Sequence, residues 1–348
     1  MRILFTGDYD LTYNRTTIIR EGLTKLGHQI VELPFKKRSR ENQKKILVEA
    51  DNCDFIFMPS FTHREVGYVR KTVGKKKFIV FDPLISRYLT KVHDYKLVTK
   101  WGLSALRNYL RDLLSMQYAD LVLTDTKAHL GYFHSTFRIP LTKMDTLYIG
   151  NNFSDYYPST NKRITDSIFR VGFYGGFIPL QGIMNILEAA EILHEQSDVR
   201  FDLIGTGFEY EKAKKFVAQK KLSNINMPGW VNFPDLRERI QQFDLALGIF
   251  GDTKKSDLVI PNKLFHYAAC ARPIITKDSP AVREIFADKE DLILTSCHPK
   301  DIAEQIAKLK NDYNKRESIG QNIYKKLLEN YSEVQVATKL IELYKRHL

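Results

Sequence analysis

Cysteine is scarce in this chain of 348 residues, and the placement of the few cysteines excludes two kinds of scaffold. The three residues, Cys53, Cys270 and Cys297, lie far apart in the sequence. They match neither a disulfide framework nor the paired spacing of a zinc site. We therefore interpret all three as small residues of a core or a loop.

The sequence also lacks a long hydrophobic run. No stretch approaches the roughly 18 to 20 apolar residues that a helix needs to cross a bilayer. The first residues, MRILFTGDYD, enter a strand-like pattern and show no apolar signal core and no cleavage site. From these features we expect a cytoplasmic protein.

Acidic residues are outnumbered, and the imbalance is confined to one half of the chain. The formal net charge is +12; residues 1–165 hold 27 Lys and Arg against 16 Asp and Glu, and the remainder holds 26 against 25. The excess gathers at residues 36–45 and 70–77. We expect weak contact of the first half with an anionic membrane surface, peripheral at its inner face; a solvated basic face is the alternative. A nucleic-acid partner is not expected, because no DNA- or RNA-binding signature accompanies the charge.

What the sequence does contain is an alternation of short apolar runs and helical stretches. Because single cores stop growing at about 250 to 300 residues, the length of the chain predicts two domains. The runs RILFT, QIVEL, CDFIFMP, KKFIVFDP and ADLVLTD predict strands with helices between them. This alternation is typical of a parallel sheet that helices cover on both faces.

The alternation lapses and then restarts. Residues 148–170 are rich in Asn, Ser, Asp, Thr and Pro, which indicates a linker. After them, FRVGFYG, RFDLIG, INMPG, DLALGIF, RPIIT and DLILT predict the strands of a second doubly wound domain. We predict domains over residues 1–165 and 166–330, and a C-terminal amphipathic helix over residues 331–348 that packs back on the first domain.

Two segments of the second domain suit an anion. Residues 171–182, VGFYGGFIPLQG, run from a strand into glycines and a helix start, where backbone N–H groups and the helix dipole favour phosphate. Further on, Pro261 falls in a first helical turn beside Asn262 and Lys263. Helices prefer acidic residues there, so Lys263 favours a bound anion. The alternatives are an ordinary strand-to-helix turn for the first segment and a solvated lysine for the second.

In this order the segments resemble the group 1, or family 4, glycosyltransferases of the retaining GT-B type. The matching segments are GGFIPLQG, LIGTG at residues 203–207, PNKLFHYAACARPII and SPAVRE. The resemblance implies an α/β GT-B fold of two Rossmann-like domains that face a cleft. It also implies transfer of a sugar from a nucleotide-sugar donor on the second domain to a glycan or lipid-linked acceptor on the first, as in cell-surface polysaccharide or glycolipid synthesis. No cofactor and no metal are expected, because helix N-termini and basic side chains would stabilise the leaving diphosphate.

The resemblance and the strand ends together give the candidate site residues. The donor site is expected to contain Gly7, Gly175, Gly176, Gln181, Gly182, Gly205, Gly207, Pro261, Asn262, Lys263, His266 and Glu284. Asp82 and His129 are catalytic candidates because such folds bind ligands at the carboxyl ends of strands, although a satisfied core residue is the alternative for His129. Asp257 is the third catalytic candidate, because it lies one position from an expected family carboxylate.

The sequence departs from the family at four positions. The family usually carries an arginine where Gly176 stands and a lysine where Gln181 stands, both on the donor diphosphate. Its pair of carboxylates, eight residues apart, would fall at Leu258 and His266. Nearby lysines are candidates for the missing charge: Lys254, Lys255 and Lys263. The departures leave two alternatives open, a non-catalytic GT-B-like subunit or binding protein and a nucleotide-sugar epimerase.

Overall fold

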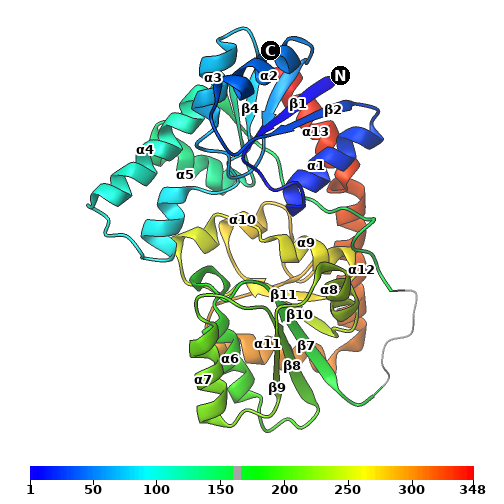
Figure 1. Cartoon of the computed structure of the whole chain (residues 1–348). Coiled ribbons are helices and arrows are strands. Elements are labelled where there is room, and N and C mark those ends of the chain that lie inside the picture. Colours follow the sequence, from blue (N-terminus) through cyan, green and yellow to red (C-terminus); the bar gives the residue numbers. More distant parts are fainter. Residues whose placement is uncertain (160–165) are drawn as a thin grey trace. The chain divides into compact units, whose positions relative to one another are not determined.

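A computed structural model describes residues 1–159 and 166–348 as two compact units, each built on its own parallel sheet (Figure 1). The first unit comprises Met1–Asn152 and Tyr331–Leu348, and the second comprises Phe153–Asn330. The predicted boundary after residue 165 adjoins residues 160–165, which lie outside the described residues. The first unit ends earlier, at Asn152, and residues 331–348 belong to it.

The sheet of the first unit has six strands in the order β2-β1-β3-β4-β5-β6, and all neighbours are parallel. The central strands β3, β4 and β5 are fully buried, which explains why they read as continuous apolar runs. The strands are β1 (Arg2–Gly7), β2 (Gln29–Pro34), β3 (Phe55–Met58), β4 (Ile79–Phe81), β5 (Leu121–Thr124) and β6 (Met144–Thr146). The short polar strand β6 was not among the runs predicted as strands.

Helices cover the first sheet in two groups. The crossovers reverse direction at β1, so α1 (Asn14–Lys25) covers one face and the next four helices cover the other. The helix α13 (Glu333–Arg346) packs on α1, and Gly22 permits it, because a Cβ there would overlap the carbonyl oxygen of Glu333. The opposite group is α2 (Arg40–Asp51), α3 (Val66–Val73), α4 (Leu103–Tyr118) and α5 (Lys127–Phe137); a π-helix (Leu89–Asp94) and a 3₁₀ turn (Leu141–Lys143) complete the unit.

The second sheet is also parallel and has six strands, but their order differs: β12-β11-β10-β7-β8-β9. Its strands are β7 (Phe169–Tyr174), β8 (Val199–Ile204), β9 (Ile225–Gly229), β10 (Leu245–Leu247), β11 (Ile274–Lys277) and β12 (Ile293–Thr295). The helix α6 (Ile183–Ile192) packs against α7 (Tyr210–Lys220) and α11 (Pro299–Asn311), whereas α9 (Asn262–Ala269) packs against α12 (Tyr313–Asn330). The remaining helices are α8 (Phe233–Gln241) and α10 (Pro280–Arg283), with 3₁₀ turns at Pro179–Gln181 and Lys254–Asp257.

The predicted fold class, two doubly wound α/β domains, is therefore confirmed. Cys53 and Cys270 are buried, Cys297 is half-buried, and none of the three forms a disulfide. Within the described residues, no helix is both long enough and apolar enough to cross a membrane.

Candidate functional site

The carboxyl edge of the second sheet brings together most residues predicted for the donor site. The strand order reverses at β7, because the chain proceeds to β8 and β9 on one side and later adds β10, β11 and β12 on the other. Open α/β sheets bind ligands at such a switch point, beyond the carboxyl ends of the strands. The loops after β7, β8 and β10 meet at this edge.

Glycines let two of these loops approach each other. Gly175 and Gly205 have φ of +149° and +135°, and a Cβ on Gly205 would overlap the carbonyl oxygen of Gly175. The N–H of Phe177 donates to the carbonyl of Thr206 at 2.9 Å, which joins the loops. Only glycine combines this conformation with such close contact, so these positions keep backbone groups at the edge of the sheet.

The remaining predicted glycines differ in what their surroundings require. A Cβ on Gly207 would lie 2.7 Å from the backbone nitrogen of Phe177, and one on Gly182 would overlap the backbone of Phe250. At Gly176, in contrast, the nearest atom would lie 3.8 Å away. Packing therefore does not demand glycine at 176, the position where the family usually carries an arginine.

Lys263, in the first turn of α9, is buried with 3% of its surface exposed. Its Nζ donates to Oε1 of Gln181 at 2.5 Å and lies 3.5 Å from the ring centroid of Phe173. No acidic side chain pairs with Lys263 in the part of the chain that the structure describes. Burial lowers the pKa of Lys263 well below its ordinary value. The prediction of a solvated lysine, the alternative given above, is therefore wrong.

His266 lies one turn further along α9 and is also buried. Its ring stacks on Tyr156 at a centroid distance of 3.9 Å, and Nδ1 lies 2.5 Å from the hydroxyl oxygen of Tyr174. Burial lowers the pKa of His266 from 6.5 to about 3, so the ring is neutral at ordinary pH. Tyr156 and Tyr174 were not predicted as site residues, because aromatic residues in a linker and a strand carry no distinctive pattern.

The other residues predicted for the donor site lie near Lys263 and His266 or in the neighbouring loops. Pro261 is the N-cap of α9 and Asn262 its first residue, while Gln181, which accepts from Lys263, closes the 3₁₀ turn before α6. Glu284 is the half-buried C-cap residue of α10. The structure therefore gathers the residues of the two predicted anion segments around one lysine.

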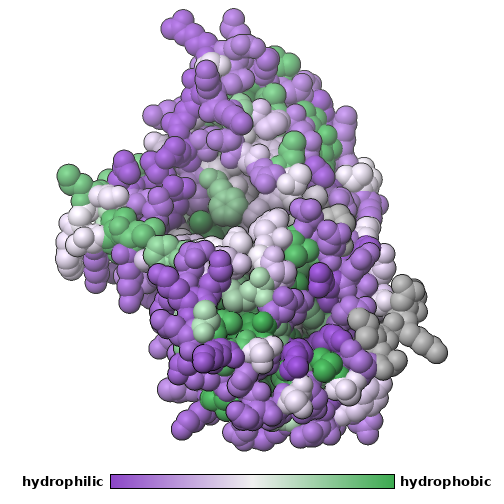
Figure 2. Space-filling view, turned by 60° about the horizontal axis from the view of Figure 1, so that its bottom comes forward, coloured by the Kyte–Doolittle hydropathy of each residue, from purple (hydrophilic) through white to green (hydrophobic). Residues whose placement is uncertain are grey.

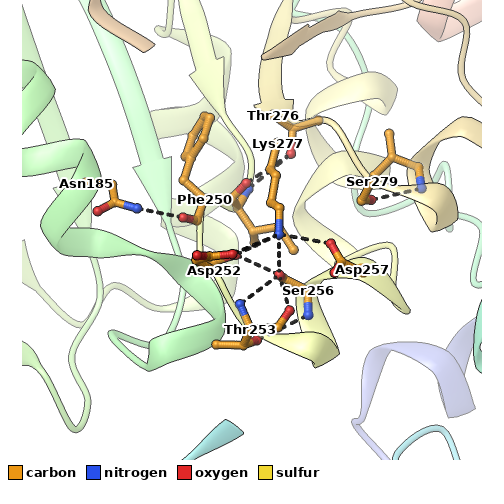
Figure 3. Close-up of polar contacts among 12 residues, drawn as sticks. Asn185, Phe250, Asp252, Thr253, Ser256, Asp257, Thr276, Lys277 and Ser279 are labelled. Carbon is orange, nitrogen blue, oxygen red and sulfur yellow. Dashed lines mark hydrogen bonds and ion pairs between the residues drawn. The ribbon is translucent and has the colours of Figure 1, made fainter. Parts of the chain in front are cut away.

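A second lysine, Lys277 at the end of β11, fixes the loop between β10 and α9 (Figure 3). Its Nζ lies 2.9 Å from Oδ1 of Asp257 and donates to Oγ of Ser256 at 3.0 Å. Ser256 in turn donates to the carbonyl of Gly251 at 2.6 Å and forms a capping box with Thr253. The loop that leads into α9 is thus held by Lys277 from the neighbouring strand.

This network defines the surroundings of Asp257, a predicted catalytic residue. Its carboxylate is 45% exposed and pairs with Lys277. Sequence reasoning missed Lys277, although a lysine directly after an apolar run, at the carboxyl end of a parallel strand, was a usable signal.

In the first unit, the predicted residue Asp82 follows β4 and is buried. Its Oδ2 lies 2.5 Å from Nε of Arg15, which is also buried and donates through Nη2 to the carbonyl of Leu147 at 2.9 Å. Burial raises the pKa of Asp82, and the guanidinium of Arg15 opposes this rise. Gly7, at the end of β1, has φ of +124°, and a Cβ there would lie 2.6 Å from a methyl group of Thr62.

The third catalytic candidate, His129, lies in the first turn of α5 and is buried. Its Nδ1 lies 2.7 Å from Oδ1 of Asp125, which follows β5, and its ring lies 4.4 Å from that of Phe133. Asp125 also raises the pKa of Asp82 electrostatically, so Asp82, Asp125 and His129 are neighbours at the carboxyl edge of the first sheet.

No group of three or more His, Cys, Asp or Glu side chains is placed to hold a metal ion within residues 1–159 and 166–348. The expectation of a metal-free site stays a prediction.

Comparison with known sequences finds a family match within the second unit. Residues 168–312, which span β7 to α11, match the model described as glycosyl transferases group 1. A relative from Methanocaldococcus jannaschii, which carries the name "Uncharacterized glycosyltransferase MJ1178", is 27% identical to this chain over 177 residues. That match covers 48% of this chain and 46% of the relative, so it spans about half the length of each protein.

Solved structures extend the likeness of fold to the whole chain. HepE of Anabaena, solved with UDP and glucose, has a TM-score of 0.74 at 13% identity, with 99% of this chain and 100% of that chain covered. Sucrose-phosphate synthase of Thermosynechococcus elongatus has a TM-score of 0.77 at 11% identity, with 99% and 98% covered. At such identities the likeness shows the fold, and the GT-B fold predicted from the sequence is confirmed.

Proposed function

We propose that this chain is a glycosyltransferase that moves a sugar from a nucleoside-diphosphate sugar to an acceptor. The observation that carries the proposal is Lys263, a buried ammonium group with no acidic partner among the described residues. Burying a charge without a partner is costly, so folding alone does not favour a lysine there. A donor diphosphate supplies the negative charge that this position lacks.

The same site stabilises the leaving group of the transfer. The first turn of α9, which contains Lys263, and the start of α6 after Gly182 offer backbone N–H groups and positive dipole ends. The diphosphate gains negative charge as the sugar leaves, and donors fixed before the reaction stabilise that charge without reorganisation. Structures of Anabaena HepE with UDP and with UDP-glucose support a uridine nucleotide as the first donor to test.

His266 replaces a carboxylate that the family uses to bind the donor ribose. In a neutral His266 ring only one of the two nitrogens carries a proton. Nε2 can therefore accept a hydrogen bond only when Nδ1 carries the proton and donates to the hydroxyl oxygen of Tyr174. We propose this tautomer for the donor complex, with Nε2 facing a ribose hydroxyl.

The predicted catalytic residues take different roles in this proposal. His129, whose Nδ1 lies within hydrogen-bond distance of Oδ1 of Asp125, is the candidate general acid or base of the first unit. Asp82 neutralises Arg15, and Asp257 anchors Lys277; we propose that both act by positioning other groups rather than on the substrate.

The acceptor belongs to the first unit in this proposal, as a glycan or a lipid-linked glycan of a cell-surface polysaccharide or glycolipid. The excess positive charge of residues 1–165 supports weak contact of this unit with an anionic membrane. Most basic side chains of residues 36–45 are exposed, whereas Arg70 is engaged by Asp120 and by the carbonyl of Tyr118.

Thermal unfolding with a panel of nucleotides and nucleotide sugars tests the donor site. UDP, GDP and their sugar conjugates are added to the wild type, to Lys263→Met and to a control, Lys212→Met, an exposed lysine of α7. A ligand at 100 times its Kd stabilises the folded state by about 2.7 kcal/mol, so one member of the panel should raise the Tm of wild type and control. The proposal fails if no nucleotide raises the Tm, or if Lys263→Met responds as the wild type does.

One observation favours a second candidate, a GT-B-like binding subunit without catalysis. Leu258 and His266 stand where the family has its two carboxylates. Assays of donor hydrolysis and of donor binding, run separately, decide between them: binding without turnover indicates the subunit. Conversion of the sugar without any acceptor indicates an epimerase.

A further inference from the structure

The helix α4 of the first unit presents its apolar residues to the solvent. Leu103, Leu106, Leu110 and Leu114 recur at helical spacing, and their exposed fractions are 87%, 53%, 42% and 45%. Four of the five residues that α4 buries are small or polar, namely Ala105, Asn108, Asp112 and Ser115, and the fifth is Met116. A helix that folds onto its own core turns its apolar stripe inward. The orientation of α4 therefore indicates that its leucine face serves an outside contact.

The chain before α4 extends this face. Trp101 is 88% exposed and Leu97 is 61% exposed, both just ahead of the helix. The N-terminal end of α4 projects from the first unit in Figure 1, and the same side of Figure 2 shows hydrophobic atoms beside strongly hydrophilic ones. Exposed apolar patches bordered by polar residues mark sites of interaction with proteins or membranes.

Arginines lie among the leucines. Arg107 and Arg111 share the face of α4, and Arg64 and Arg38 approach it from the loops after β3 and β2. Together with the leucines they line an open cavity of about 690 Å³. Among the described residues that line this cavity, none is acidic. Arg38 has one acidic partner nearby, Glu65, at 3.6 Å.

The electrostatics of the cavity favour an anion. Burial, and then repulsion from Arg64, Arg87 and Arg107, lowers the pKa of Arg111, while Asp112 opposes this shift. Asp112 is occupied elsewhere, because its Oδ2 accepts from Oγ of Ser86 at 2.8 Å and from the N–H of Tyr88 at 2.9 Å. At Arg111, the neighbouring arginines therefore outweigh the opposing carboxylate of Asp112.

We propose that Trp101 and the leucine and arginine face of α4 dock on the surface of an anionic phospholipid bilayer. The apolar side chains enter the boundary between headgroups and acyl chains, and the arginines bind lipid phosphates. An anionic bilayer thus offers negative charge beside apolar chains, which matches arginines beside leucines on α4. The inference rests on the membrane contact in the proposed function but not on sugar transfer. It differs from attraction by the basic segments 36–45 and 70–77, because burial of leucine and tryptophan persists at high salt.

Co-sedimentation with vesicles separates these two modes. Vesicles of phosphatidylglycerol and phosphatidylcholine, and of phosphatidylcholine alone, are mixed with the wild type, Leu106→Asp/Leu110→Asp and Arg107→Glu/Arg111→Glu. The matched controls are Leu328→Asp, at an exposed leucine of α12, and Lys75→Glu/Lys76→Glu, an equal charge reversal in the other basic segment. We expect each α4 variant to bind the anionic vesicles more than about tenfold more weakly, and each control to change binding by less than about threefold.

The fluorescence of Trp101 reports insertion directly. The chain has two tryptophans, so Trp230→Phe leaves Trp101 as the only one. We expect its emission to shift to the blue with anionic vesicles, to be quenched by lipids brominated on the acyl chains, and to keep part of the shift at high salt.

Three results with vesicles overturn the proposal. They are an unchanged Trp101 spectrum with bound vesicles, complete release of the protein at high salt, and loss of binding in the lysine control as large as in the α4 variants. A lipid-independent dimer that the α4 leucine variant abolishes would identify a second copy as the partner and also overturn it. Because none of these measurements uses a nucleotide, their failure leaves the test of the donor site unaffected.

Discussion

Each unit buries a cation near the carboxyl edge of its sheet, Arg15 in the first and Lys263 in the second, and the surroundings of these two cations are opposite. In the first unit the guanidinium of Arg15 pairs with Asp82 at 2.5 Å. In the second unit Lys263 meets an amide oxygen of Gln181 and the ring of Phe173. The carboxylate of Asp82 balances the charge of Arg15 without any ligand. A buried cation that has only neutral partners gains most from an external anion.

The largest effect is expected from Asp82→Ala, because this change leaves the buried Arg15 without its carboxylate partner. Removing one partner of a buried ion pair leaves the other charge uncompensated and costs about 3 to 5 kcal/mol. We expect the free energy of unfolding in urea to fall by that amount. Replacing both partners, Arg15→Met with Asp82→Leu, should restore most of it; a loss below about 1 kcal/mol in the single variant would contradict the pairing seen here.

The second prediction is that Lys263→Met weakens nucleotide binding without weakening the fold. Hydrogen bonds to charged groups contribute about 1.5 to 3 kcal/mol, so the Kd for the nucleoside diphosphate should rise about 10- to 100-fold by calorimetry. The free energy of unfolding without nucleotide should stay the same or increase, because the variant no longer buries an ammonium group. If Lys263→Met lowered the free energy of unfolding as strongly as Asp82→Ala does, Lys263 would be a structural residue, as Arg15 is.

The third prediction concerns acid. The pKa of His266 is about 3 in the folded chain, and its ordinary value of 6.5 applies after unfolding. Between these pH values the unfolded chain binds more protons at this site, so the free energy of unfolding falls as pH falls from 6.5 towards 3, by at most about 1.4 kcal/mol per pH unit. His266→Gln should reduce that slope. A control at an exposed histidine, His298→Gln, should leave it unchanged; equal slopes in wild type and His266→Gln would exclude a buried neutral ring.

Much of the fold followed from patterns that a sequence carries locally. Apolar runs separated by helical stretches predict a parallel sheet wherever both faces are covered, and the buried strands β3, β4 and β5 obey this rule. Lys263 was found for a similar local reason, because a lysine in the first turn of a helix opposes the helix dipole. The three-residue strand β6 escaped detection, since it is too short and polar to show a period.

What the sequence could not supply were partners distant along the chain. Asp82 was chosen for its place at a strand end, but its role depends on Arg15, which lies 67 residues away. Stacking of Tyr156 on His266 likewise joins a linker to α9. Lys277 meets Asp257 only because β11 lies beside β10 and the loop between β10 and α9 turns back over its end. Such pairs are set by topology, which periodicity does not encode.

The smallest effect is expected from Lys277→Met. This variant tests whether nucleotide binding by the second unit depends on Lys277, a cation that has a carboxylate partner. Asp257 is 45% exposed, so its ion pair with Lys277 contributes no more than about 1 kcal/mol to stability. The nucleotide Kd should rise only a few-fold, because Lys277 acts on the loop at residues 251–257 and not on Lys263. Amide hydrogen exchange should report the difference: amides of that loop should exchange faster in Lys277→Met and at the wild-type rate in Lys263→Met. If Lys277→Met abolished nucleotide binding while the loop stayed protected, Lys277 would itself be a ligand of the diphosphate. The contrast between a paired structural cation and an unpaired binding cation would then fail within the second unit.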